Sequence, residues 1–152
     1  MKEEKPANYF EGILQLRDVS QEVIDFVEEN CMMQGPRMVS KVKKVKNGFD
    51  FYIQSNKYLT KLGKLIRSNF DGELTKSASL HTKDKQSSKE LYRLTILFRE
   101  ANFSKGDIIT VKGERYQIIG ISKDVLAKDL LTNKKKHFSF EQLRQLKARK
   151  SY

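Results

Sequence analysis

Three groups of basic side chains are the residues whose types and spacing suggest a chemical role. In chain order they are Lys41, Lys43, Lys44 and Lys46; then Lys83, Lys85, Lys89 and Arg93; then Lys134, Lys135 and Lys136 with Lys147, Arg149 and Lys150 of the tail. Lysine is a point charge on a flexible stem, so it suits contact with phosphates better than bidentate recognition of bases. The groups together predict an RNA-binding surface, although any one alone is also explained as a solvated hairpin tip.

The net charge behind these groups is unevenly distributed. The 152 residues include 30 Lys or Arg and 19 Asp or Glu, a formal net charge of +11. Residues 1–36 have three basic and eight acidic residues (net −5), whereas residues 37–152 have 27 basic and 11 acidic ones (net +16). Such a field attracts polyanions. Nucleic acid is the expected partner, ahead of an anionic membrane, because no basic amphipathic helix carries bulky apolar anchors.

Catalytic and metal-binding arrangements are poorly supported. His81 and His137 are the two histidines, and both have basic surroundings that disfavour a metal cation. The single cysteine, Cys31, excludes an internal disulfide framework and a multi-cysteine zinc site, and its acidic neighbours would raise its pKa. No glycine-rich phosphate loop is present. We therefore expect no enzyme activity, no metal, no cofactor and no small-molecule substrate.

The elements that would position the cations follow from apolar periodicity. Residues 8–99 predict the order β-α-β-β-α-β-β, in which Ser20 caps the first helix and Asn47-Gly48 forms a tight hairpin turn. A second hairpin over residues 72–99 would present three lysines at its tip. The expected fold class is α+β, with a mixed, mostly antiparallel sheet carrying two helices.

Alternation within the strands predicts which side of the sheet is buried. The strand at residues 8–17 places on its apolar side Phe10, Gly12, Leu14 and Leu16. In the last strand of the sheet, the more apolar side comprises Tyr92, Leu94, Ile96 and Phe98, and the other side comprises Leu91, Arg93, Thr95 and Leu97. We expect the apolar sides to form the core.

The pattern changes near residue 100. Residues 101–152 contain four short predicted strands, which cannot bury a face as a flat sheet, so we expect closure into a small SH3-like β-barrel. A basic C-terminal helix over residues 140–150 is expected to pack through Phe140, Leu143 and Leu146. The predicted organisation is a flexible tail at 1–7, an α/β domain at 8–100 and a barrel with its helix at 101–152.

Four stretches resemble, in the same order, the large-ribosomal-subunit export adaptor family, which takes its name from nonsense-mediated mRNA decay. They are "YFEGILQLR" (9–17), "GFDFYIQSNKYLTKLGKLIRSNFDGEL" (48–74), "KDKQSSKELYRLTILFR" (83–99) and "FSKGDIITVKGERYQIIGI" (103–121). The resemblance implies a ribosomal-protein-like α/β domain followed by an SH3-like domain similar to part of the hypusine-bearing translation factor. It also implies a non-catalytic factor that binds the large ribosomal subunit at its intersubunit side during maturation.

The sequence departs from that family at both ends. Family members usually begin with a zinc module of Cys-x-x-Cys pairs, and eukaryotic members end with nuclear transport signals; neither is present here. This pattern suits an archaeal-type member, either naturally short or trimmed of its zinc module. We expect a cytoplasmic protein, because no apolar run approaches the roughly 20 residues that span a bilayer and the first residues lack the apolar core of a secretory signal.

The expected function is docking on the large ribosomal subunit, through rRNA and ribosomal proteins, during maturation or to block premature subunit joining. The chain is expected to act as a monomer. The alternative is a protein-interaction adaptor that recruits a translation or RNA-processing factor through the acidic first helix and the barrel. An RNA-processing enzyme is a third class, but the sequence names no carboxylate for it.

Overall fold

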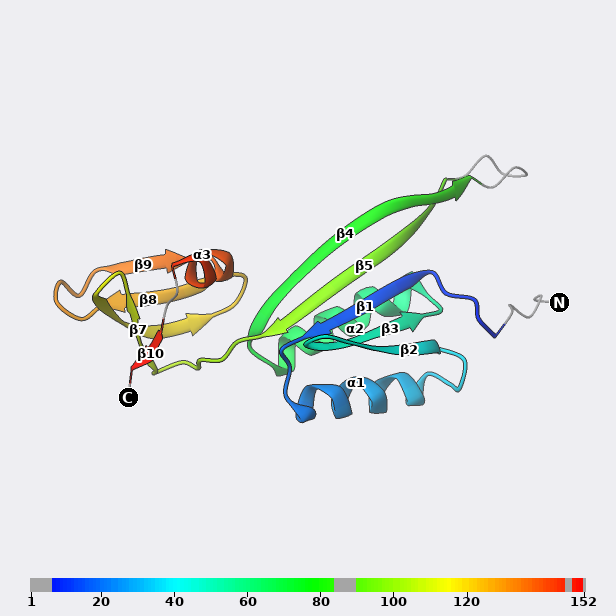
Figure 1. The fold of residues 1–152 in the computed structure, drawn as a ribbon, viewed down its shortest axis with the longest axis horizontal. Helices are drawn as coiled ribbons and strands as arrows, with labels where there is room; N and C mark the ends of the chain where they lie inside the picture. The colour runs from blue at the N-terminus through cyan, green and yellow to red at the C-terminus, as the bar shows by residue number, and fades with distance from the viewer. Residues whose placement is uncertain (1–6, 84–89, 147–148, 152) are drawn as a thin grey trace. The chain divides into compact units, whose positions relative to one another are not determined.

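The structure is a computed structural model that describes residues 7–83, 90–146 and 149–151 (Figure 1). The chain divides into two compact units. Unit 1 comprises Met1–Phe70 with Leu74–Glu100, and unit 2 comprises Asp71–Glu73 with Ala101–Tyr152. The described residues form two sheets and three helices, and this mixed α+β class is the one that the sequence predicts. No helix within the described ranges is long and apolar enough to cross a membrane.

Unit 1 contains one five-stranded sheet and two helices. Its elements are β1 (Gly12–Arg17), α1 (Gln21–Met33), β2 (Val39–Val45), β3 (Gly48–Ile53), α2 (Asn56–Asn69), β4 (Gly72–Lys83) and β5 (Glu90–Glu100). The strand order is β2-β3-β1-β5-β4. The central strand β1 is antiparallel to β3 and parallel to β5, so segments far apart in the sequence lie side by side.

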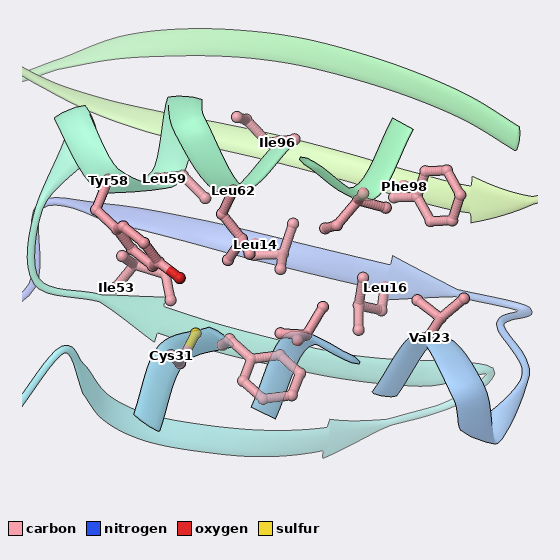
Figure 2. Close-up of a cluster of buried hydrophobic side chains, with 13 residues drawn as sticks. Leu14, Leu16, Val23, Cys31, Ile53, Tyr58, Leu59, Leu62, Ile96 and Phe98 are labelled. Atoms are coloured by element: carbon pink, nitrogen blue, oxygen red, sulfur yellow. The ribbon is translucent and has the colours of Figure 1, made fainter. Parts of the chain in front are cut away.

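Both helices cover the same side of this sheet. Leu14 of β1 is fully buried, and its register partners are Phe51 of β3 and Ile96 of β5. Figure 2 shows this side of the strands facing side chains that include Val23 of α1 and Leu62 of α2. Burial of each such side chain contributes about 1.5–3 kcal/mol. The predicted apolar sides of β1 and β5 do form the core from Gly12 and Leu94 onward.

Phe10, just before β1, was predicted to lie on the buried side of the sheet, and this prediction is wrong. Strand β1 begins at Gly12, and the residues just before it point to the opposite sides from those that the alternation within the strand predicts. The Glu11 carboxylate accepts a hydrogen bond from the backbone N–H of Asn56 (2.7 Å), at the start of α2. A carboxylate there satisfies an unpaired N–H and complements the positive end of the helix dipole. The Phe10 ring packs instead on Tyr52, which points away from the helices.

The first hairpin turns one residue earlier than predicted. Its two loop residues are Lys46 and Asn47, and of the predicted Asn47-Gly48 pair only Asn47 has a positive φ (72°). Gly48 instead begins β3, opposite Arg17 of β1. A Cβ atom at Gly48 would overlap the carbonyl oxygen of Leu16, so the glycine is needed for close approach of two strands.

Unit 2 contains the second five-stranded sheet and one short helix. Its elements are β6 (Ile108–Val111), β7 (Glu114–Ile121), β8 (Val125–Asp129), β9 (Lys135–Phe138), α3 (Phe140–Gln145) and β10 (Arg149–Ser151). The strand order is β10-β6-β7-β8-β9, with antiparallel pairing throughout. Closure into a barrel is not confirmed, because the outer strands β9 and β10 are not paired with each other in the part of the chain that the structure describes.

The predicted C-terminal helix is too long. It ends at Gln145, and Leu146 occupies the C-cap position while packing against the core as expected. Arg149–Ser151 form a strand that pairs with β6. The open edge of β6 offers this segment backbone hydrogen bonds, and such tertiary pairing overrides a modest helix propensity.

Candidate nucleic-acid interface

The side of the first sheet opposite α1 and α2, which we call the helix-free face, collects most of the basic residues described in unit 1 strands. The side chains assigned to it here include Phe10; Ile13, Gln15 and Arg17; Lys41 and Lys43; Asp50 and Tyr52; and Arg93, Thr95, Leu97 and Arg99. These positions alternate with the buried residues of β1, β3 and β5. Five of the twelve side chains are cationic, and Asp50 is the one carboxylate among them.

A row of two aromatic rings with a cation at each end crosses this face. The Lys41 Nζ lies 5.6 Å from the centroid of the Tyr52 ring. Tyr52 meets Phe10 edge to face, with centroids 4.8 Å apart and an interplanar angle of 89°. The Arg93 guanidinium carbon lies 3.9 Å from the Phe10 centroid. Each cation–π contact contributes about 0.5–1 kcal/mol at exposed sites, so these contacts favour the observed arrangement of the rings and cations.

Two arginines of the face are held by carboxylates. The Arg17 Nη2 lies 2.7 Å from Asp50 Oδ1, and these side chains are only 17% and 13% exposed. The Arg17 Nη1 donates to the backbone carbonyl of Leu16 (2.9 Å). Arg99 pairs with Asp18, which follows β1. Arg17 and Arg99 therefore brace the sheet, and the net positive charge of the face comes from the remaining cations.

The structure separates the first predicted group of lysines into two. Lys41 and Lys43 lie on the helix-free face, opposite Tyr52 and Asp50 of β3. Lys44 alternates to the other side of β2, and Lys46 lies in the turn. All four are exposed, and three of them lie on the edge strand β2, where lysine also discourages pairing with other chains.

The second predicted group is only partly described. Arg93 is on β5 and half buried, and Lys83 is the last residue of β4. Lys85 and Lys89 lie outside the described residues. The prediction that this hairpin tip contacts RNA therefore stays a prediction.

The third predicted group belongs to unit 2. Lys134, Lys135 and Lys136 are exposed at the start of β9, with the Lys136 Nζ 5.1 Å from the Phe138 ring centroid. Lys147 lies outside the described residues, whereas the backbones of Arg149 and Lys150 pair with β6. In the same unit, the His137 Nδ1 lies 3.2 Å from Asp124 Oδ1, so this histidine is engaged with a carboxylate.

The chemistry of Cys31 differs from that of a catalytic thiol. Burial raises the pKa of Cys31 to about 11, the negative charge of Glu28 adds to this rise, and contact with Tyr58 opposes it. The predicted direction is correct, but burial rather than the acidic neighbours is its main cause. No group of three or more His, Cys, Asp or Glu suited to a metal ion occurs in the part of the chain that was described.

A family model described as "NMD3, second domain" matches residues 9–99. The chain belongs to the NMD3 family. The match spans more than half of the 152 residues and includes every member of the helix-free face. No curated protein matches the chain.

The sequence did not identify the aromatic part of this NMD3-domain surface. Tyr52 lies in the aromatic-rich stretch "GFDFYI", and strand alternation places it opposite the buried Phe51 and Ile53, which was the available signal. Phe10 could not be found in this way, because the alternation is inverted there. The ion pair between Arg17 and Asp50 joins residues that are 33 positions apart, on β1 and β3. It depends on the register between these strands, which the local pattern does not give.

A second surface of unit 1 is an apolar groove between α1 and β2. Its lining includes Cys31, Val39, Val42 and Phe51, and Glu28 lies at its side. Met32 lines the same groove and is 77% exposed. Its exposure follows from its place next to Cys31 near the end of α1, where successive residues point in different directions.

Proposed function

We propose that the chain is a non-catalytic factor that docks on the large ribosomal subunit, through rRNA and ribosomal proteins. It would act during maturation of that subunit or to block premature subunit joining. The observation that carries the proposal is the NMD3 second-domain match over residues 9–99, together with the resemblance that the sequence shows. The net charge of +16 over residues 37–152 supports RNA as the first partner.

The described cations suit backbone recognition of RNA. Lys41 and Lys43 are exposed on the helix-free face, and Lys134, Lys135 and Lys136 are exposed on unit 2. Ammonium groups on flexible stems contact phosphates without reading bases, which is the usual way that folded RNA is recognised. We further propose that the protein acts as a cytoplasmic monomer without a cofactor, and that unit 2 is an SH3-like module.

Co-sedimentation with purified large subunits tests the proposal. Binding should weaken steeply with salt, because a protein that makes six to ten phosphate contacts loses about 10³–10⁵ in affinity between 50 and 200 mM. A Lys41→Glu, Lys43→Glu double variant should bind less. The matched control is a Lys57→Glu, Lys61→Glu variant, which reverses two exposed lysines on α2, on the other side of the sheet. Sedimentation only with assembled ribosomes or free mRNA, or with neither, would contradict the proposal.

The apolar groove favours the adaptor as a second candidate function. Met32 and Val42 are 77% and 48% exposed beside it, and exposed apolar clusters of this kind mark interaction surfaces. A Val42→Asp variant should abolish binding of a recruited translation factor and leave large-subunit binding intact. Under the adaptor function, reversing Lys83, Lys85 and Lys89 to Glu should leave partner binding intact. Under the RNA function, the same change should cause a large loss of subunit binding.

A further inference from the structure

We propose that the helix-free face is a stacking platform for unpaired bases of RNA, formed by Phe10 and Tyr52 with Lys41 and Arg93. The inference rests on the proposed RNA-binding function and goes further, because it assigns contacts with bases to a surface whose lysines alone would contact only phosphates. The four side chains form one continuous row through contacts of 5.6, 4.8 and 3.9 Å between ring centroids and their neighbours.

The rings are positioned for this role rather than for the core. Strand register places Tyr52 opposite Ile13, on the side of the sheet away from both helices. Phe10 reaches that side only because Glu11 turns to the start of α2. Both rings remain half buried, so neither is enclosed by the apolar cluster of unit 1. An aromatic ring at such a surface offers a planar apolar contact to any base.

The cations provide the complementary contacts for a polyanion. The Arg93 guanidinium lies against the Phe10 ring, and guanidinium planes themselves accept stacked bases. Lys41 lies opposite Tyr52 and Lys43 lies opposite Asp50, and both lysines are exposed, so they can contact the phosphates of a bound strand. Asp50, the one carboxylate of the face, is held by Arg17, which reduces its repulsion of phosphates.

Single-stranded RNA fits these features better than duplex RNA or an acidic peptide. Bases within a duplex are stacked on each other, so their planar surfaces cannot reach an aromatic ring. An acidic peptide would engage the cations but would gain little from the paired rings. An unpaired segment engages both, with stacking on rings and phosphates on lysines.

Fluorescence anisotropy of the full chain with three labelled RNAs tests the inference. The probes are a 12-nucleotide oligouridylate, an abasic ribose-phosphate strand of the same length, and a base-paired hairpin with the same number of phosphates. The oligouridylate should bind more tightly than either of the others. Tyr52→Leu and Phe10→Leu should each weaken it by about fivefold to a hundredfold, the range for loss of one stacked base, while leaving the abasic strand unchanged.

Two controls separate stacking from folding and from charge. Tyr92→Leu removes an aromatic ring that is 51% exposed but alternates to the other side of β5, so it should leave oligouridylate binding unchanged. Leucine keeps apolar area at each site, and circular dichroism confirms that each variant is folded. Cross-linking of an oligomer containing 4-thiouridine should label peptides that contain Phe10 or Tyr52, which provides a readout independent of affinity.

The outcomes distinguish failure of the inference from failure of the proposed function. Suppose that the chain binds large subunits but binds abasic RNA as tightly as it binds oligouridylate. The stacking platform is then wrong, and docking through the RNA backbone remains supported. The same conclusion follows if Tyr52→Leu and Tyr92→Leu have equal effects on oligouridylate binding. Preferred binding of the hairpin, or of an acidic peptide, overturns it in the same way. If no RNA and no subunit binds, both proposals fail.

Discussion

The Asp50→Asn substitution should affect stability and RNA affinity in opposite directions. Asp50 is the one carboxylate assigned to the helix-free face, and it accepts a 2.7 Å charge-assisted hydrogen bond from Arg17. Replacing it by asparagine removes the ion pair and leaves the face one unit more positive. The variant should therefore be less stable and should bind RNA more tightly.

The magnitude of the stability loss follows from the burial of the pair. Exposed ion pairs contribute about 0.2–1 kcal/mol, and hydrogen bonds to charged groups contribute about 1.5–3 kcal/mol. Side-chain exposures of 17% and 13% place this pair between the two classes. Asparagine retains one oxygen acceptor, so we expect a loss of about 1–2 kcal/mol in the free energy of unfolding of unit 1.

The expected gain in affinity is smaller. A unit charge about 6 Å from a phosphate in water contributes about 0.7 kcal/mol, which corresponds to roughly threefold tighter binding at low salt. The gain should vanish at high salt, because exposed charges are screened.

A double-mutant cycle with Arg17→Met measures the pair directly. Hydrogen exchange of the β1 and β3 amides in increasing urea reports the stability of unit 1 without contribution from unit 2, and anisotropy with oligouridylate reports affinity. The coupling energy between the two substitutions should be about 1–2 kcal/mol. A coupling below about 0.3 kcal/mol, within the usual error of additivity, would refute the reasoning about burial. An affinity that falls together with stability would refute the reasoning about charge.

Three further predictions concern single residues. Cys31 should react slowly with thiol reagents at pH 8 in the folded chain, because it is buried and its pKa is raised from 9.0 to about 11. The thiol ionises at lower pH in the unfolded chain than in the folded chain. The contribution of Cys31 to the free energy of unfolding should therefore fall as pH rises from 9 toward 11. Gly48→Ala should destabilise unit 1 by more than about 1 kcal/mol in urea unfolding, because the new Cβ would overlap the carbonyl oxygen of Leu16. Ser139→Ala should lower the stability of unit 2 by about 1 kcal/mol, because it removes the capping box that Ser139 forms with Gln142.

Each of these predictions has a direct control. Rapid labelling of folded Cys31 at a rate equal to that in denaturant would show that the thiol is accessible. Gly120→Ala is matched to Gly48→Ala, because nothing lies within 4 Å of a Cβ built there; equal losses for both would argue against strand overlap. Ser139→Asp keeps an oxygen acceptor and should retain most of the stability that Ser139→Ala loses.

Local patterns predicted much of unit 1 because its strands are half buried. Leu14 and Leu16 on β1, and Ile96 and Phe98 on β5, follow the two-residue period, since one side of each strand meets the helices. The start of α2 is also local in origin, because Ser55 immediately precedes the helix and its hydroxyl accepts a hydrogen bond from the Tyr58 N–H (3.2 Å).

The errors occur where long-range contacts override local pattern. Phe10 follows the strand period in the sequence, but the hydrogen bond from Asn56 to Glu11 inverts the chain before β1. Arg149 and Lys150 were predicted to end the C-terminal helix, but with Ser151 they pair with the open edge of β6 instead. The row from Lys41 to Arg93 joins Phe10 to Tyr52, 42 positions later, and to Arg93, 83 positions later, so composition predicts its cations and not its rings.

The parallel pairing of β1 with β5 has a consequence for synthesis of the protein. Arg17 of β1 is the register partner of Arg99 of β5, so β1 cannot complete its pairing until residues 82 positions later have been synthesised. At 5–20 residues per second, this interval is about 4–16 s. During that time β1 can pair with β3 but exposes its other edge, and exposed strand edges favour association with other chains. The nascent chain is therefore most prone to misassembly after β3 has been made and before β5 emerges.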